Sequence, residues 1–143
     1  MEPYYVIYYS QTGNTKEMAE AVGEGIAAAG GEAKIVPVED ARVDMIKDAQ
    51  VFALGCPACG AENLEEACVE PLVTEVESFA SGKRILLFGS YSWGGGEWMH
   101  DWEKRMQDAG AQLIGGEGVI CNEAPDDETL ARCRELGKKM AEA

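Results

Sequence analysis

Five short apolar runs, separated by stretches with helical periodicity, constrain the fold of this chain more than any other feature. The runs are YYVIYY (4–9), AKIVPV (33–38), VFALG (51–55), ILLFG (85–89) and EGVIC (117–121). They are nearly continuous and rich in β-branched or aromatic residues, which is typical of strands buried on both faces of a parallel sheet. The sequence therefore predicts a parallel sheet of five strands.

The stretches between these runs carry apolar residues at helical spacing. Met18, Val22 and Ile26, for example, recur every four residues before Gly30. Patterns of this kind cover 18–26, 69–79, 98–109 and 130–140. Strands that alternate with helices imply right-handed crossovers, and hence an α/β fold with a doubly wound sheet and helices on both faces. In such a fold, ligands bind beyond the carboxyl ends of the strands.

Length, charge and cysteine content limit the class of protein. The 143 residues suffice for a single domain over 1–143. A formal net charge of -14 argues against nucleic acid as a partner and favours a basic partner protein. The amino terminus has no signal-peptide pattern, and no run of about 20 apolar residues could span a bilayer. Five cysteines, an odd number, favour free thiols. We therefore expect a cytoplasmic protein without membrane contacts.

The stretch SQTGNT after the first apolar run has the composition of an anion-binding loop. Several of its side chains can donate hydrogen bonds, and its glycine lets a ligand approach the backbone. The helix that follows adds free N–H groups and the positive end of its dipole. The loop residues are Ser10, Gln11, Thr12, Gly13, Asn14 and Thr15. Since the Walker A and G-x-G-x-x-G patterns are missing, a terminal monophosphate is favoured over a nucleoside triphosphate or NAD.

An ordinary helix cap is the alternative interpretation of the same stretch. Thr12 or Asn14 would cap the helix, and Glu17 would complete a capping box three residues after Asn14. The stretch alone leaves both interpretations open.

Three tryptophans divide into two groups. Trp93 lies among serine and glycine residues in SYSWGGG (90–96), outside the predicted strand and helix, so we expect an exposed ring that is available for stacking. Trp98 and Trp102 lie at helical spacing with Met106, so we expect both in the core.

A C-x-x-C motif follows the third predicted strand. Cys56 and Cys59 could form a redox-active dithiol, or a metal site together with Cys68. Zinc needs four ligands and His100 is the one histidine, which disfavours the metal. A thioredoxin-like dithiol starts a long helix directly, whereas Gly60 and polar residues intervene here. Ordinary free thiols are therefore favoured.

Three stretches of this sequence resemble the flavodoxin family. They are SQTGNT (10–15), LEEACVEP (64–71) and FGSYSWGGGEWM (88–99). The resemblance is to the short-chain, clostridial type and extends almost from end to end of the chain. The sequence lacks the insertion in the last strand that marks long-chain members. It implies a sheet of order 2-1-3-4-5, one noncovalently bound FMN, and a low-potential carrier of single electrons between redox enzymes. It implies neither catalytic residues nor a metal.

The resemblance also implies an FMN site built from three loops. Ser90 would add a hydroxyl to the phosphate, and Trp93 would cover the outer face of the ring. Cys59 would pack on the inner face, the Gly60 carbonyl would lie near flavin N5, and Glu62 near N3. The site residues expected outside SQTGNT are Pro57, Ala58, Cys59, Gly60, Ala61, Glu62, Ser90, Tyr91, Trp93 and Gly94.

The second loop departs from the family pattern at two positions. Pro57 stands where a phosphate-binding serine is common, and Ala61 where aspartate or glycine is usual. Two other functions remain as alternatives, namely an FMN-dependent NAD(P)H or quinone reductase of the same fold, and a thiol-disulfide oxidoreductase using Cys56 and Cys59. Such reductases usually need longer loops than these.

Acidic residues flank the predicted loops. They are Glu62, Glu65, Glu66, Glu97, Asp101, Glu123, Asp126 and Asp127. Collectively they would steer basic redox partners toward the flavin, and we expect the chain to meet them as a monomer in transient complexes.

Overall fold

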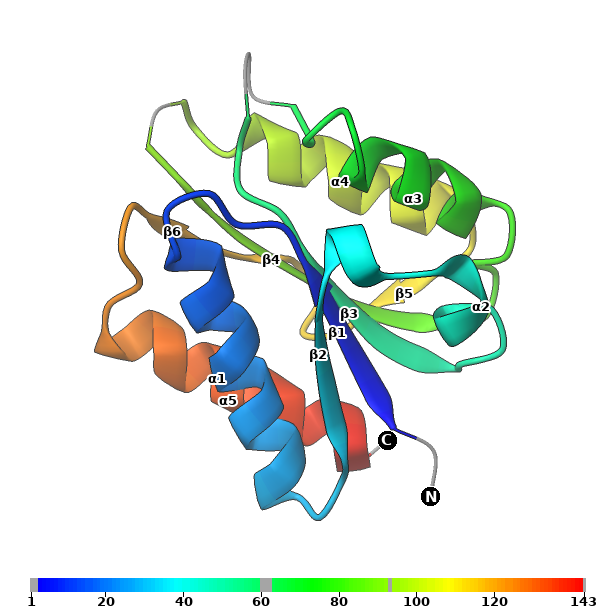
Figure 1. The fold of residues 1–143 in the computed structure, drawn as a ribbon, viewed down its shortest axis with the longest axis horizontal. Helices are drawn as coiled ribbons and strands as arrows, with labels where there is room; N and C mark the ends of the chain where they lie inside the picture. Colours follow the sequence, from blue (N-terminus) through cyan, green and yellow to red (C-terminus); the bar gives the residue numbers. More distant parts are fainter. Residues whose placement is uncertain (1–2, 60–62, 93, 143) are drawn as a thin grey trace.

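The computed structural model describes residues 3–59, 63–92 and 94–142 as a sheet between two layers of helices (Figure 1). The strands are β1 (Tyr4–Tyr8), β2 (Ala33–Pro37), β3 (Val51–Gly55), β4 (Arg84–Tyr91), β5 (Gln112–Leu113) and β6 (Val119–Asn122). The helices are α1 (Asn14–Ala28), the 3-10 helix η1 (Val38–Asp40), α2 (Val43–Ile46), α3 (Val69–Glu77), α4 (Glu97–Asp108) and α5 (Asp127–Glu142).

The strand pairs are all parallel, in the order β2-β1-β3-β4-β5. This order confirms the predicted doubly wound α/β fold. The fifth position is shared by two short strands, because β5 pairs with the first residues of β4 and β6 pairs with its last residues. Gly115 and Gly116 lie between them with φ of 82° and 86°, a conformation that glycine adopts without strain.

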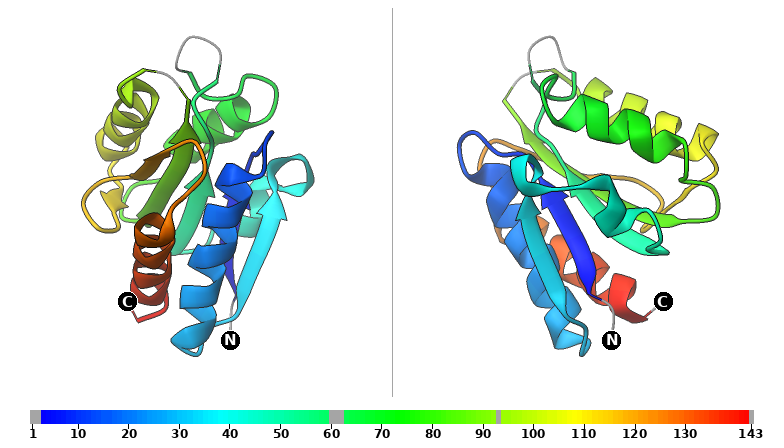
Figure 2. Two further views of the ribbon diagram at one scale, coloured as in Figure 1. Left: turned by 90° about the vertical axis from the view of Figure 1, so that its left-hand side faces the viewer. Right: turned by 45° about the vertical axis from the view of Figure 1, so that its right-hand side comes forward.

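Both faces of the sheet are covered by helices. Figure 2 shows α1 and α5 on one face and α3 and α4 on the other. Alternate residues of β4 enter the two apolar clusters: Ile85 and Leu87 pack with α3 and α4, whereas Leu86 and Phe88 pack with α1 and α5. Because successive strand residues point to opposite faces, burial on both sides accounts for the continuous apolar runs.

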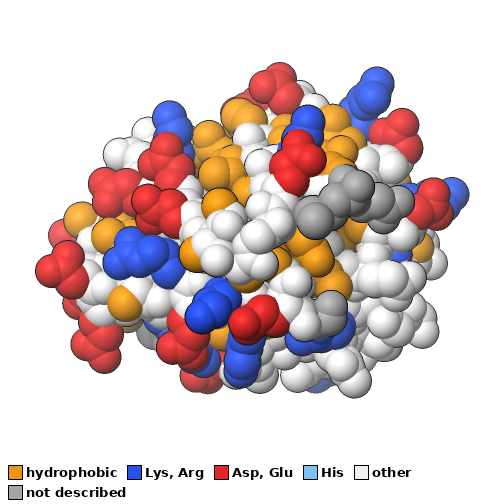
Figure 3. All heavy atoms as spheres, turned by 90° about the horizontal axis from the view of Figure 1, so that it is seen from below, with side chains coloured by type: hydrophobic (Ala, Val, Ile, Leu, Met, Phe, Trp, Pro, Cys, Tyr) orange, Lys and Arg blue, Asp and Glu red, His pale blue; other side chains and the backbone are white. Residues whose placement is uncertain are grey.

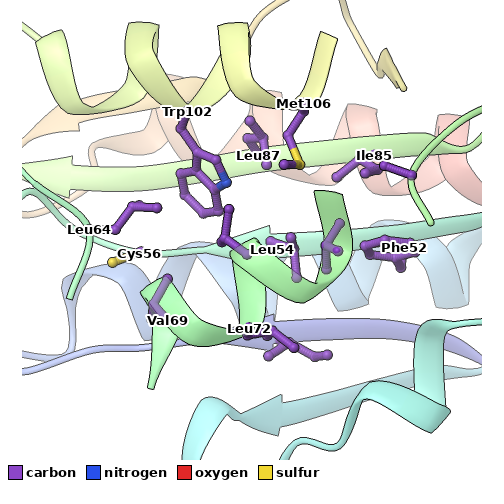
Figure 4. Packing of buried hydrophobic residues seen from close by; sticks show 14 of the residues in the cluster. Phe52, Leu54, Cys56, Leu64, Val69, Leu72, Ile85, Leu87, Trp102 and Met106 are labelled. Atoms are coloured by element: carbon purple, nitrogen blue, oxygen red, sulfur yellow. The ribbon is translucent and has the colours of Figure 1, made fainter. Parts of the chain in front are cut away.

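The prediction that Trp98 and Trp102 belong to the core is confirmed, since each is about 1% exposed. Figure 4 shows Trp102 directed from α4 toward the sheet near Leu54 and Leu87. The Trp98 Nε1–H group donates to the Cys56 carbonyl oxygen at 2.9 Å. Within the described residues, Trp102 Nε1 has no hydrogen-bond partner. The two indoles are thus equally buried but differ in hydrogen bonding.

Helices α1 and α5 approach each other closely at two glycines. A Cβ atom on Gly25 would overlap the Arg134 carbonyl oxygen, and one on Gly137 would overlap the Val22 carbonyl oxygen. Backbone therefore meets backbone at both positions, where a side chain has no space.

Two further observations concern the helices of the described chain. The short helices η1 and α2, between β2 and β3, were not predicted from the sequence. None of the helices in ranges 3–59, 63–92 and 94–142 combines the length and apolar character needed to cross a bilayer.

Candidate functional site

The loops that follow β1, β3 and β4 lie together at the carboxyl edge of the sheet (Figure 1). Ser90, which is buried, connects all three. Its N–H group donates to Thr15 Oγ1 at 3.4 Å, and its carbonyl oxygen accepts the Ala58 N–H group at 3.1 Å. These bonds link the start of α1 and the second loop to the end of β4.

Helix α1 begins without a side-chain cap among the described residues. Its N-cap residue is Gly13, with φ of 94°, so the alternative interpretation, a helix cap by Thr12 or Asn14, is wrong. The chain enters the helix in a left-handed conformation, which places the side chains of both residues away from the N-cap position. Glu17 makes the first helical bond through its N–H group, to the Gly13 carbonyl oxygen at 3.0 Å.

The first loop is folded by an internal hydrogen bond and keeps donors at its surface. The Gly13 N–H group donates to Ser10 Oγ at 3.0 Å, while Gln11 and Thr12 are exposed. A Cβ atom built on Gly13 would meet nothing within 4 Å, so space lies in front of its backbone. Neutral donors, uncapped N–H groups and a positive helix end in one open place suit a phosphate.

The second loop continues the pairing of β3 and then closes a turn. The Cys56 N–H group donates to the Phe88 carbonyl oxygen at 3.0 Å. Cys59 and Asn63 exchange two backbone hydrogen bonds of 2.9 and 2.8 Å. Pro57 and Cys59 are half-buried, as is Ala58. The base of this turn is therefore fixed by backbone pairing.

Four predicted site residues lie outside the described residues, namely Gly60, Ala61, Glu62 and Trp93. The predictions for them stay predictions.

The third loop is anchored to the loop that follows β6. Tyr91 is half-buried, and its ring lies 5.6 Å from that of Trp98, centroid to centroid. The Tyr91 carbonyl oxygen accepts the Glu123 N–H group at 2.7 Å. Gly94 is exposed, with φ of 82°. The loop after β6 thereby borders the same edge.

The five cysteines are free thiols. Among the described residues, no group of three or more His, Cys, Asp or Glu side chains is placed to hold a metal ion.

Glu65 has a structural role that sequence reasoning missed. Its carboxylate accepts the N–H groups of Ala67, Cys68 and Val69 at 2.8 to 3.0 Å. Partial burial opposes ionisation, but these three bonds outweigh it and lower the pKa of Glu65. A glutamate just before a helix with an acidic first turn was the available signal. Glu65 thus caps α3 next to the second loop.

Replacing Glu65 by glutamine is expected to lower the free energy of unfolding by about 1 kcal/mol at neutral pH, because a charged cap becomes a neutral one. The folded-state pKa lies below the unfolded value, so this stabilisation is complete above about pH 4.3 and is lost as the pH falls through the folded pKa. Urea unfolding of the wild type and of Glu65→Gln at a series of acid pH values measures this difference in the free energy of unfolding. Glu66→Gln, at an exposed neighbour, is the control. A difference that persists unchanged in strong acid would contradict the cap.

An acidic groove of about 440 Å³ adjoins the second loop. Its lining residues are Asn63, Leu64, Glu66, Glu70, Trp98, Asp101, Trp102 and Arg105. Arg105, the basic residue of this lining, is bound to Glu70 at 2.8 Å and to Glu77 at 3.0 Å. Its charge is therefore balanced locally, which leaves Glu66 and Asp101 to determine the sign of the groove.

The amino-acid sequence was compared with protein-family models and with known proteins, and it matches flavodoxins in both comparisons. The family model described as Flavodoxin matches residues 6–137. The chain is 44% identical to the flavodoxin of Megasphaera elsdenii over 96% of this chain and 98% of that one. It is 40% identical to the flavodoxin of Clostridium beijerinckii over 95% and 97% of the two chains.

The structural comparison agrees with the sequence comparison. The solution structure of two-electron reduced Megasphaera elsdenii flavodoxin superposes with a TM-score of 0.88 at 43% identity. The match covers 98% of this chain and 99% of that one.

Proposed function

This chain belongs to the flavodoxin family, and from that membership we propose that the three loops at the carboxyl edge of its sheet hold the cofactor. It binds FMN and transfers electrons, as a carrier and not an enzyme. FMN supplies reversible one-electron chemistry. We further propose that residues 1–143 form one FMN-binding domain, in keeping with the single sheet.

The first loop would bind the FMN phosphate. The observation that carries this assignment is the Ser90 connection, since it brings the start of α1, the second loop and the end of β4 to one place. The phosphate would be held by Ser10, Gln11, Thr12, Gly13, Asn14, Thr15 and Ser90. Neutral donors and the helix N-terminus would balance its charge.

The second and third loops would hold the flavin ring. The residues assigned to it are Pro57, Ala58, Cys59, Gly60, Ala61, Glu62, Tyr91, Trp93 and Gly94. The paired backbone bonds of Cys59 and Asn63 support the assignment of the second loop, because they fix the position of Cys59 beside Pro57 and Ala58. Trp93 would exclude water from one ring face and Cys59 from the other.

Thr12→Ala is expected to weaken FMN binding by about 1 to 3 kcal/mol, or roughly fivefold to 150-fold in Kd, because one phosphate oxygen loses its donor. Titration of the apoprotein by flavin fluorescence measures the change, with Thr74→Ala as the control, since Thr74 bonds Glu70 on α3. Riboflavin has no phosphate, so its binding should be weak and equal in both proteins. Wild-type protein that binds riboflavin as tightly as FMN would contradict the phosphate site.

We infer that the partners are basic redox proteins. None of the sequences SQTGNT (10–15), CPACGAENLEEAC (56–68), SYSWGGG (90–96) and CNEAPDD (121–127) contains Lys or Arg. The opposite end of the molecule, where the termini lie, carries lysine and arginine among acidic and apolar side chains (Figure 3). This asymmetry would orient a basic partner toward the loops. The same acidic surroundings disfavour added negative charge, so we expect a low reduction potential.

Electron transfer to a basic redox protein is expected to slow as ionic strength rises, because salt screens the attraction of exposed charges. Stopped-flow measurement of the second-order rate constant across a salt series tests this. The double variant Glu66→Gln, Asp101→Asn removes two groove charges and should flatten the salt dependence. A wild-type rate that is indifferent to ionic strength would exclude the steering.

We also propose that the chain acts as a monomer in the cytoplasm. Among the described residues, Ile35 is the exposed large apolar side chain, at 38%, and single exposed apolar side chains are normal on monomers. Five free cysteines suit a reducing compartment.

A further inference from the structure

Strand β6 (Val119–Asn122) lies at the lateral edge of the sheet. It pairs with β4 on one side, and no other strand of the described residues pairs with its second side. Figure 2 shows β6 as the outermost strand there, with α4 to one side of it and α5 to the other. An edge strand presents N–H and C=O groups that a further strand can bind.

The pairing with β4 identifies the backbone groups of β6 that face outward. The Glu123 N–H group donates to the Tyr91 carbonyl oxygen at 2.7 Å, so the backbone of Glu123 faces β4. Successive residues of a strand direct their backbone groups to opposite sides. Val119 and Cys121 therefore also face β4, whereas the N–H and C=O groups of Ile120 point away from the sheet.

The open part of this edge has definite ends. Before β6, the Gly118 N–H group donates to the Glu103 carboxylate at 2.6 Å, which satisfies a donor that a further strand would otherwise bind. A Cβ atom on Gly118 would overlap Met99 Sδ, so α4 borders the strand closely at this point. After β6, Glu123 leaves the extended conformation, with φ of 58°. The edge available to a further strand is therefore β6 itself.

Two grooves follow the two sides of β6. One of about 290 Å³ lies between β6 and α4, and one of about 470 Å³ lies between β6 and α5. Because Val119, Ile120 and Arg132 line both, the two grooves form one trough with the edge strand in its floor. None of the described residues assigned to FMN lines this trough, which runs along the side of the sheet and not at the carboxyl ends of its strands. Bound FMN therefore leaves it open.

The trough is acidic. Its carboxylates are those of Glu103, Glu117, Asp126, Glu128 and Glu135. The basic side chains of the described lining are His100 and Arg132, and Arg132 is bound to Glu135 at 2.7 Å. Like charges would repel two copies of this chain whose β6 edges met, whereas a strand that carries lysine would be attracted.

We propose that the β6 edge is a docking surface for an extended, lysine-rich segment of another protein, which adds to the sheet as a further strand. The main chain of this segment would bond to the N–H and C=O groups of Ile120. Because side chains of a strand alternate, its lysines would reach the carboxylates beside α4 and those beside α5 in turn. This is a second contact surface, separate from the loops that hold FMN.

The test uses the FMN-bound full chain and the peptide acetyl-KVKKVK-amide, which presents lysine and valine on both sides of a strand. Amide hydrogen exchange followed by NMR measures the pairing. Saturating peptide should slow exchange at the Ile120 amide by about tenfold or more, whereas the Val119 and Cys121 amides, bonded to β4 in either state, should change little. Methylation of the two central peptide amides, one on each edge of the strand, keeps the charge and should weaken binding by about tenfold.

Two double variants test the contribution of charge. Glu117→Gln with Glu128→Gln removes one carboxylate from each groove and should weaken peptide binding by about fivefold. Glu66→Gln with Asp101→Asn, in the acidic groove beside the second loop, should bind the peptide as the wild type does.

Three results with the wild type would overturn the proposal, even where a variant fails to fold. The first is an Ile120 amide that gains no protection at saturating peptide. The second is equal affinity for the methylated and unmethylated peptides. The third is protection of Ile120 that rises with protein concentration in the absence of peptide, which would identify a second copy of this chain as the occupant.

Discussion

Trp98→Ala is expected to lower the free energy of unfolding by about 5 kcal/mol, the upper end of the range for a buried tryptophan. The substitution opens a cavity beneath α4 and also removes the donor that the Cys56 carbonyl oxygen uses at 2.9 Å. A buried carbonyl left without its donor adds about 1 to 3 kcal/mol. Urea unfolding monitored by circular dichroism measures the loss.

The two phenylalanine variants separate packing from hydrogen bonding. Trp98→Phe and Trp102→Phe remove the same atoms from side chains of equal burial. Only the first breaks a described hydrogen bond, because Trp102 Nε1 has no partner among the described residues. Trp98→Phe should therefore be the more destabilising by about 1 to 3 kcal/mol. Equal losses would show that the bond to Cys56 contributes little to stability.

Gly25→Ala is expected to destabilise the protein by about 3 kcal/mol, the upper end for an overpacked core, because the new methyl group overlaps the Arg134 carbonyl oxygen on α5. Backbone on both sides cannot move aside as a side chain can, so the helices must separate. Thermal and urea unfolding provide the measurement.

Gly23→Ala, two residues earlier in α1, is the matched control. Its methyl group would meet the end of the Ile35 side chain at 2.6 Å, and that side chain is exposed and can rotate away. Alanine also favours the helix by up to about 1 kcal/mol relative to glycine. We therefore expect Gly23→Ala to be neutral or stabilising. If both variants behaved alike, the close approach of α1 and α5 would not limit this position.

The arrangement of the long elements was predictable from the sequence because each carries a repeated signal. Apolar runs such as ILLFG are buried on both faces of the sheet, and Trp98 and Trp102 recur with the helical period. The glycines and polar residues after the strands marked the loops that Ser90 brings together. Topology and patterning thus determine the place of the site.

The parts that were not predictable depend on short or tertiary features. Helix α2 spans four residues, too few to show a period, and β5 spans two. The two interpretations of the start of α1 could not be separated, because Gly13 adopts a positive φ that composition does not reveal. The Trp98 bond to Cys56 joins residues far apart in the sequence. Such contacts exist only once the chain is folded.

The packing of α5 on α1 has a consequence for the order in which a nascent chain can fold. The face of the sheet under α3 and α4 is built from segments that are synthesised, and therefore leave the ribosome, before α5 (Asp127–Glu142). The other face needs α5, whose Cys133, Leu136 and Met140 complete its cluster. During synthesis that second face stays open to water and to chaperones until the last helix emerges, because domains bury their apolar surface only when the covering segments are available.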